Sequence, residues 1–308
     1  MKEKSLRNKT IDDTVEQGAG YLDKVFKFSG QKLCFDDVKN KTVLGDSIEF
    51  MKSLPDKCFD LIIADPPYNL NKDFHGYKFG EKGFGEYEKY TLSWLVECKR
   101  LLKDTGSIYV CCDWKSSLVI GNIMANLFVL RNRITWEREK GRGAKSNWKN
   151  SMEDIFFATV TDDYTFNLEK VKVLKKVIAP YTQDGKPKDW QQTENGKFRK
   201  TCPSNFWNDV SVPYWSMPEN TAHPTQKPEK LIAKLILASS NENDLVFDPF
   251  LGSGTTSVTA KKLKRNFVGV EQNPRYCVWA EKRLALADEN PSIQGYDGKV
   301  FMQRNCKA

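Results

Sequence analysis

Short apolar runs alternate with longer stretches of helical spacing from residue 41 onward, and this alternation is the strongest constraint on the fold. Strands that alternate with helices of this kind are typical of βαβ units, whose strands pair in parallel. We therefore expect an α/β fold with a doubly wound, mostly parallel sheet. The expected strands are residues 42–44, 59–64, 107–112, 133–136, 155–158, 245–248 and 266–271, and the expected helices are residues 47–54, 87–102, 118–130, 230–239, 255–263 and 275–287.

The alternation is interrupted by a segment rich in Lys, Arg, Trp, Asn, Gly and Pro. Residues 131–200 hold 16 lysines and arginines against 10 acidic residues, which is most of the net charge of +8. Such a stretch is either a solvated insertion or a surface for an anionic partner. We expect a polar N-terminal arm at residues 1–40, one domain from residues 41–137 and 223–290, a basic insertion at residues 138–222 and an irregular tail at residues 291–308.

The composition excludes several classes of protein. Two histidines and eight cysteines without a CxxC pair argue against a metal centre, so no metal is expected. Since no apolar run approaches the roughly 18 residues that span a bilayer, we expect no membrane contact. The polar N-terminus lacks the apolar segment of a secretion signal, which favours a cytoplasmic protein with reduced thiols.

The run at residues 59–64 stops at Asp65-Pro66-Pro67-Tyr68. Two prolines end a strand and make the backbone after it rigid. The rigid segment presents the Asp65 carboxylate and a proline carbonyl as acceptors, while proline itself has no N–H donor. These two acceptors suit an amino group with two N–H donors, and the tyrosine ring can stack on a heterocycle. Acceptors on both protons would direct the nitrogen lone pair toward an incoming methyl group. The simpler alternative is a Pro-Pro turn in which Asp65 caps backbone amides.

A second motif is the sequence Asp248-Pro-Phe-Leu-Gly-Ser-Gly-Thr255, which links an expected strand to a helix. Its glycines permit close approach of a ligand, and the helix N-terminus offers free N–H groups. The next expected strand ends at Glu271, where an acid can accept hydrogen bonds from ribose hydroxyls. The pattern indicates a ligand that contains adenosine; alternatively, it is a tight turn followed by a solvated carboxylate.

A third motif, His223-Pro-Thr-Gln-Lys-Pro228, precedes the helix expected at residues 230–239. Lys227 lies where the helix dipole opposes a positive charge, so helix stability does not explain it. A nearby anion, such as a ligand carboxylate, would explain it, whereas the alternative is an exposed lysine in a turn between prolines.

In this order the three motifs resemble the S-adenosylmethionine-dependent DNA amino-methyltransferases of the beta group. In that group the DPPY motif comes first, a target-recognition region follows, and the cofactor loop comes last. The resemblance covers about residues 41–287 and implies a Rossmann-like methyltransferase fold. It implies S-adenosylmethionine as cofactor, double-stranded DNA as partner and a base that is flipped out of the duplex.

The resemblance also implies residue roles. Asp65 and the Pro66 carbonyl would hold the target amino group, Pro67 would complete the rigid motif, and Tyr68 would stack on the base. Thr225 and Lys227 would lie near the methionine carboxylate. The residues implied in cofactor binding are Asp46, Thr225, Lys227, Asp248, Phe250, Gly252, Gly254, Thr255 and Glu271.

Given these motifs, the basic segment becomes a candidate for phosphate contacts and base readout. The candidate DNA-binding residues are Arg133, Arg138, Lys140, Arg142, Lys145 and Lys149. Asn69, Leu70 and residues 74–84 are expected to form a mobile loop over the site, with His75 as a plain surface histidine. A cognate restriction endonuclease and a homodimer would both be compatible with the group.

The leading interpretation is methylation of adenine N6, because the resemblance implies that a motif beginning with Asp rather than Ser favours adenine. Cytosine N4 is an exocyclic amine that the same two acceptors could hold. An RNA or protein amide methyltransferase, and a nucleic-acid-binding protein without activity, are further alternatives. Direct in-line transfer of an activated methyl group needs no metal and no covalent intermediate.

Overall fold

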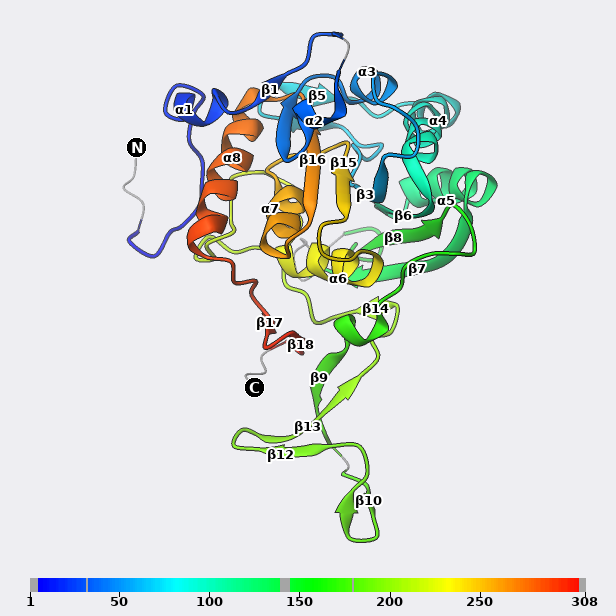
Figure 1. Cartoon of the computed structure of the whole chain (residues 1–308), viewed down its shortest axis with the longest axis vertical. Helices are drawn as coiled ribbons and strands as arrows, with labels where there is room; N and C mark the ends of the chain where they lie inside the picture. Colours follow the sequence, from blue (N-terminus) through cyan, green and yellow to red (C-terminus); the bar gives the residue numbers. More distant parts are fainter. Residues whose placement is uncertain (1–4, 32, 139–144, 179, 305–308) are drawn as a thin grey trace.

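The computed structural model describes residues 5–31, 33–138, 145–178 and 180–304. Its centre is a nine-stranded sheet with the strand order β1-β2-β16-β15-β3-β6-β8-β7-β14. Helices cover both faces of this sheet (Figure 1). The strands are β1 (Phe26–Lys27), β2 (Lys41–Leu44), β3 (Phe59–Ala64), β6 (Leu102–Cys112), β7 (Val129–Glu137), β8 (Met152–Thr159), β14 (Phe206–Trp207), β15 (Leu245–Asp248) and β16 (Asn266–Glu271).

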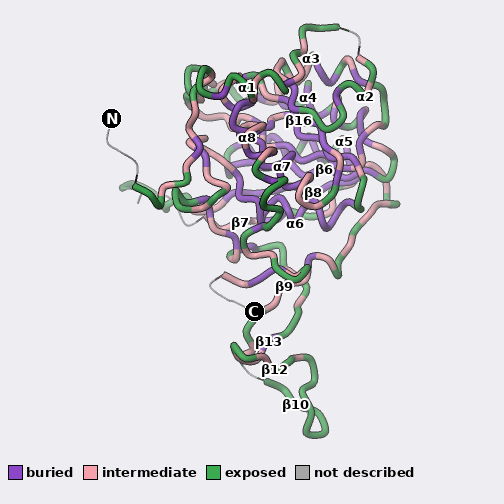
Figure 2. The backbone as a smooth tube through the Cα atoms, turned by 60° about the vertical axis from the view of Figure 1, so that its left-hand side comes forward, coloured by how far each residue is buried: buried purple, intermediate pink, exposed green. Residues whose placement is uncertain are grey.

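Two hydrophobic cores lie on opposite faces of the sheet, and buried backbone therefore runs through the middle of the molecule (Figure 2). Helices α3, α4 and α5 pack on one face, and α6, α7 and α8 pack on the other. The helices are α1 (Ala19–Leu22), α2 (Phe35–Val38), α3 (Ser47–Lys52), α4 (Phe84–Leu101), α5 (Ser116–Leu127), α6 (Glu229–Ser239), α7 (Thr255–Lys262) and α8 (Pro274–Glu289).

The central strands pair in parallel, which confirms the predicted fold class. β3 lies between β15 and β6 and is parallel to both. Its apolar side chains are buried on both faces, as is typical of a central parallel strand. β8 is the exception: it runs antiparallel to both β6 and β7. The amino end of β8 therefore lies at the same edge of the sheet as the carboxyl ends of β3, β15 and β16.

Three local details differ from the expected elements. α4 ends at Leu101 and β6 begins at the next residue, so no loop separates them. α5 ends at Leu127, before the predicted helix end at residue 130, because Phe128 turns the chain into the extended conformation and Val129 starts β7. The tail expected to be irregular contains β17 (Tyr296–Asp297) and β18 (Val300–Met302).

The range predicted as an insertion, residues 138–222, contributes β8 and β14 to the main sheet. The rest of it includes a 3₁₀ turn (Leu168–Val171) and an exposed arm that extends away from the body (Figures 1 and 2). β18 of the tail pairs with β9 at the base of this arm. The strands of the arm are β9 (Val173–Lys176), β10 (Thr182–Gln183), β11 (Lys186–Pro187), β12 (Gln191–Thr193) and β13 (Gly196–Thr201).

The N-terminal arm is attached to the body by apolar and polar contacts with α8. Ile11 is buried against Trp279 of α8 and forms a bridge with Thr221. The Trp279 indole N–H donates to the Asp13 carbonyl at 2.9 Å, and Lys282 forms an ion pair with the Asp13 carboxylate. A sequence pattern could not predict these contacts, because each depends on a single residue and the segment has little hydrophobic periodicity.

Replacement of Phe247 tests how far the core supports the central strands. Phe247 is fully buried, and its ring stacks on Phe59 with centroids 4.5 Å apart. We expect Phe247→Ala to lower the free energy of unfolding by about 3–5 kcal/mol, because it leaves a cavity. We expect less than about 0.5 kcal/mol for the exposed Phe84→Ala. Urea unfolding measures both, and equal losses would contradict the assignment of Phe247 to the core.

Candidate active site

A cavity of about 550 Å³ opens at the edge of the sheet where β3, β15 and β16 end. Ligands of open α/β sheets bind beyond the carboxyl ends of the strands. The sequence motifs, which are far apart in the chain, meet here. The predicted catalytic and cofactor residues that line the cavity are Asp46, Asp65, Pro66, Pro67, Tyr68, Thr225, Lys227, Asp248, Phe250, Gly252, Thr255 and Glu271.

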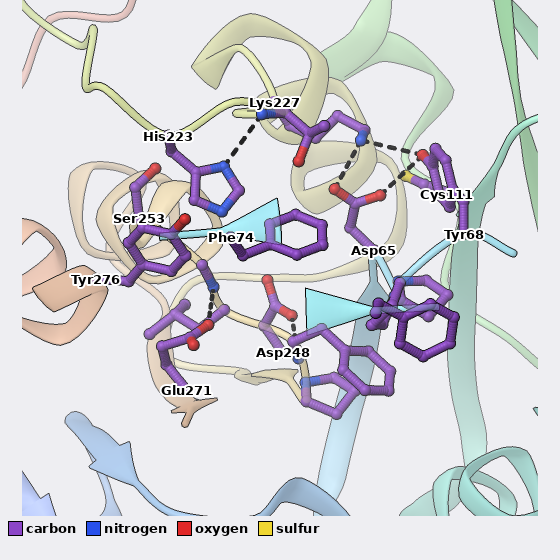
Figure 3. Close-up of a pocket in the computed structure, with 18 of the residues that line it drawn as sticks. Asp65, Tyr68, Phe74, Cys111, His223, Lys227, Asp248, Ser253, Glu271 and Tyr276 are labelled. Atoms are coloured by element: carbon purple, nitrogen blue, oxygen red, sulfur yellow. Dashed lines mark hydrogen bonds and ion pairs between the residues drawn. The ribbon is translucent and has the colours of Figure 1, made fainter. Parts of the chain in front are cut away.

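The side chains of Asp65, Tyr68 and Lys227 point toward one another at one end of the cavity (Figure 3). The Lys227 ammonium donates to Asp65 Oδ2 at 2.6 Å and to the Tyr68 hydroxyl at 3.1 Å. The Tyr68 hydroxyl donates to Asp65 Oδ1 at 2.9 Å. Asp65 therefore accepts on both carboxylate oxygens, and one of its two donors is a lysine from the third motif.

Burial controls the protonation of these groups. It raises the pKa of Asp65, although the neighbouring ammonium opposes the shift. Burial alone would lower the pKa of Lys227, but the Asp65 and Glu153 carboxylates together raise it above its ordinary value. Burial raises the pKa of Tyr68 well above its usual range, so its hydroxyl keeps its proton. Two carboxylates thus favour the charged form of Lys227.

The glycine loop between β15 and α7 forms the other end of the cavity. Gly252 has a φ of +54°, and its N–H donates to Glu271 Oε2 at 2.9 Å. The second Glu271 oxygen accepts from the Asn273 N–H at 2.8 Å. Gly254 is the one predicted cofactor residue that does not line the cavity: at a φ of +87° it packs on Ala280, where a Cβ would lie 2.7 Å from a side-chain carbon. Gly254 therefore serves the packing of the loop on α8.

Two acids in this part of the cavity are poised near neutral pH. Burial raises the pKa of Asp248 to about 7 and that of Glu271 to about 7. Asp46 caps α3, because its side chain accepts from the Glu49 N–H. Phe250, Ile48 and Val270 add apolar surface. Carboxylate acceptors beside apolar walls match an adenosine ligand, which has hydroxyl donors and a flat ring, so these residues fit S-adenosylmethionine.

The loop after the DPPY motif forms a hairpin, β4 (Lys72–Phe74) with β5 (Tyr77–Phe79), and contributes to the cavity wall. The hairpin is fastened to α8: His75 Nδ1 lies 2.8 Å from the Tyr276 hydroxyl, and the Asn273 side chain donates to the Phe74 carbonyl at 3.1 Å. Residues 72–79 therefore form a hairpin at the cavity, and His75 is exposed, as expected of a surface histidine, but also contacts Tyr276.

The predicted DNA-binding residues fall into three groups. Arg133 and Arg138 form ion pairs with Asp154 and Glu153, and Arg138 also lines the cavity. Lys145 and Lys149 are exposed. The last two candidates, Lys140 and Arg142, lie outside the described residues.

Sequence reasoning missed several residues of the site. Glu153, at the start of β8, contacts Lys227 and Tyr68. The buried Arg283 of α8 donates to the Ser253 carbonyl at 2.8 Å and to the Thr255 hydroxyl at 3.0 Å, which fixes the glycine loop. No local signal pointed to Glu153, because the expected strand began at residue 155 and this acid lay outside it.

Across the described ranges, no group of three His, Cys, Asp or Glu residues is arranged to hold a metal ion. Nor does this part of the chain contain a helix that is long and apolar enough to cross a membrane.

Comparison with known proteins gives consistent matches. A DNA methylase family model that covers N6 and N4 enzymes matches residues 59–282. "Type II methyltransferase M.HpaI" from Haemophilus parainfluenzae is 36% identical over 269 residues, which is 86% of this chain and 79% of the relative. "DNA adenine methyltransferase YhdJ" from Escherichia coli (strain K12) is 35% identical over 254 residues, which is 80% of this chain and 83% of the relative.

A solved structure named "M1.HpyAVI-SAM complex" has a TM-score of 0.54 and 25% identity, and the match covers 79% of this chain and 98% of that one. The family match includes the DPPY motif, the His223 to Pro228 segment and the glycine loop. The chain belongs to the N6/N4 DNA methylase family and is an S-adenosylmethionine-dependent DNA methyltransferase.

Proposed function

We propose that this enzyme methylates the N6 amino group of a flipped-out adenine at a specific sequence in double-stranded DNA. The observation that carries the proposal is the Asp65 carboxylate, which already accepts an N–H donor from Lys227 at 2.6 Å inside the cavity. A relative named as a DNA adenine methyltransferase supports adenine as the target.

The target amino group would bind where two acceptors meet. Asp65 Oδ2 and the Pro66 carbonyl would accept its two protons, and Pro67 supplies no N–H that could compete for the carbonyls. The Tyr68 hydroxyl is engaged by Asp65, which holds the tyrosine ring at the cavity wall, where a base could stack on it. These contacts would orient the nitrogen lone pair for transfer.

The cofactor would occupy the other end of the cavity. S-adenosylmethionine supplies a methyl group already activated on a sulfonium. Glu271 would accept from the ribose hydroxyls, and Phe250 and Asp46 would lie near the adenine. Thr225 would lie near the methionine carboxylate, and we propose Asp248, Gly252 and Thr255 as the remaining contacts. Gly254 would act indirectly, since it packs the loop on α8.

DNA would contact the basic surface beside the cavity. We propose phosphate contacts for the exposed Lys145 and Lys149 and for Arg133, whose side chain is about half exposed. Lys140 and Arg142 stay candidates from the sequence alone. Arg138 is engaged by Glu153, so a role inside the cavity suits it better than a phosphate contact.

The biological setting is proposed from a relative's name. The relative named as a type II methyltransferase supports a role in a restriction–modification system. We propose that the enzyme acts in the cytoplasm on nucleoid DNA and protects it from a cognate endonuclease. A homodimer stays a prediction from the family resemblance.

Analysis of the product tests the base assignment. The purified enzyme would be incubated with S-adenosylmethionine and genomic DNA from a methylation-deficient strain, and the nucleosides would be separated by mass spectrometry. We expect N6-methyladenine, and N4-methylcytosine in its place would overturn the assignment.

We expect Asp65→Ala to lower the rate at least about 100-fold, because an acceptor for the reacting group is lost. Its dissociation constant for S-adenosylhomocysteine should stay within about twofold.

Cofactor affinity should depend on pH through Asp248 and Glu271. Burial raises the pKa of each to about 7, so both bind protons as the pH falls from 8 to 6. A ligand that needs the ionised acids then binds more weakly, by at most about tenfold per pH unit and per acid. Calorimetry with S-adenosylhomocysteine measures the slope. We expect a smaller slope for Glu271→Gln, and an unchanged slope in that variant would exclude Glu271 as the titrating group.

The same pKa values predict how the ligand-free protein responds to pH. An acid whose pKa is higher in the folded state than in the unfolded state favours folding when protonated. Stability due to Asp248 and Glu271 should therefore decrease as the pH rises from about 5 to about 7. We expect the stability difference between wild type and Glu271→Gln, measured by urea unfolding at several pH values, to change across this window. A constant difference would contradict the raised pKa of Glu271.

A further inference from the structure

Glu153 is a buried carboxylate that no sequence motif includes, and it lies beside the proposed catalytic group. It occupies the second position of β8, which begins at the catalytic edge because the strand is antiparallel. Only 3% of the residue is exposed, and it lines the cavity. Burial of an unpaired carboxylate would cost free energy, so the groups that pair with Glu153 indicate its role.

Those partners connect Glu153 to the DPPY motif. Glu153 Oε2 lies 3.2 Å from the Tyr68 hydroxyl, as an alternative acceptor to Asp65 for its single proton, and 3.2 Å from the Lys227 ammonium. Its other oxygen accepts from Arg138 Nη1. Asp65 and Glu153 thus share one lysine, and Arg138 supplies a second cation, so the four charges balance.

Lys227 occupies the acceptor that the target base requires. Its ammonium donates to Asp65 Oδ2, the oxygen that would accept an amino proton of the flipped base. The base must therefore replace the lysine on this oxygen. A buried ammonium that loses a carboxylate partner is strongly destabilised unless a second carboxylate remains. Glu153 is the second carboxylate within reach of Lys227.

We propose that Glu153 is a positioning residue that retains Lys227 while Asp65 releases it to the target amino group. The carboxylate of Glu153 would keep the ammonium paired during this exchange. It would also hold the Tyr68 hydroxyl, and so the ring, when Asp65 Oδ1 adjusts to the base. Arg138 would keep Glu153 in place. The inference depends on the proposed role of Asp65 as the amino-group acceptor and applies to adenine and cytosine alike.

The test compares steady-state methylation by wild type, Glu153→Gln and Glu153→Asp on genomic DNA from a methylation-deficient strain. The amide of Gln preserves the volume but removes the charge that retains the lysine. We expect kcat to fall about 10- to 100-fold in Glu153→Gln, because misplacement of a reacting group has effects of this size. S-adenosylhomocysteine affinity should stay within about twofold, and Glu153→Asp should recover part of kcat.

Asp154→Asn provides a matched control. Asp154 is the next residue of β8, is fully buried and pairs with Arg133 at 3.0 Å. It is absent from the cavity wall, because consecutive side chains of a strand point to opposite faces. We expect this variant to lose stability in urea at least as much as Glu153→Gln does, yet to keep its kcat.

A double-mutant cycle with Lys227→Met examines the coupling directly. If Glu153 acts by retaining Lys227, its replacement has little further effect on kcat once the ammonium is gone. Independent, multiplying losses would overturn the proposal. So would a normal kcat in Glu153→Gln, or a loss of kcat that Asp154→Asn reproduces.

The variant Asp65→Ala separates this inference from the proposed function. Full activity of Asp65→Ala would refute the proposed function. An inactive Asp65→Ala together with a fully active Glu153→Gln would refute only the inference about Glu153.

Discussion

The ion pair between Lys227 and Asp65 organises the edge of the sheet at which the cavity opens. Its two atoms lie 2.6 Å apart and join residues that are separated by 162 positions in the sequence. The ammonium connects the end of β3 to the segment before α6, and Glu153 adds the start of β8. Because a charge in this interior needs partners, the pair fixes three segments relative to one another before any substrate binds.

The fold could be predicted from the sequence to a large extent. β3 is bounded by the residues expected, because six apolar or half-buried residues followed by Pro-Pro leave no alternative. β15 and β16 were equally clear, and they end in Asp248 and Glu271, two acids that line the cavity beside the glycine loop. These elements carry local signals, namely strand length, proline and glycine, that do not depend on the rest of the chain.

Features that depend on distant partners could not be predicted. The position of Lys227 was recognised as unfavourable for helix stability, and an anion was inferred, but nothing local identified that anion as Asp65. Glu153 resembled any charged residue at a strand end until the antiparallel pairing of β8 placed it in the cavity. Similarly, nothing near Ile11 in the sequence indicated that this residue packs with Trp279, which lies near the other end of the chain.

The strand order has a consequence for how the chain is made. β3 needs β15 as a neighbour, and the Leu245 N–H that bonds Asp60 is 185 residues further along the chain. During synthesis one edge of this apolar strand therefore stays unpaired until most of the protein has left the ribosome. An open strand edge is a template for wrong pairing, and contacts of such long range form slowly. The edge of β3 that faces β15 is therefore the part of the sheet most exposed to wrong pairing until Leu245–Asp248 has been made.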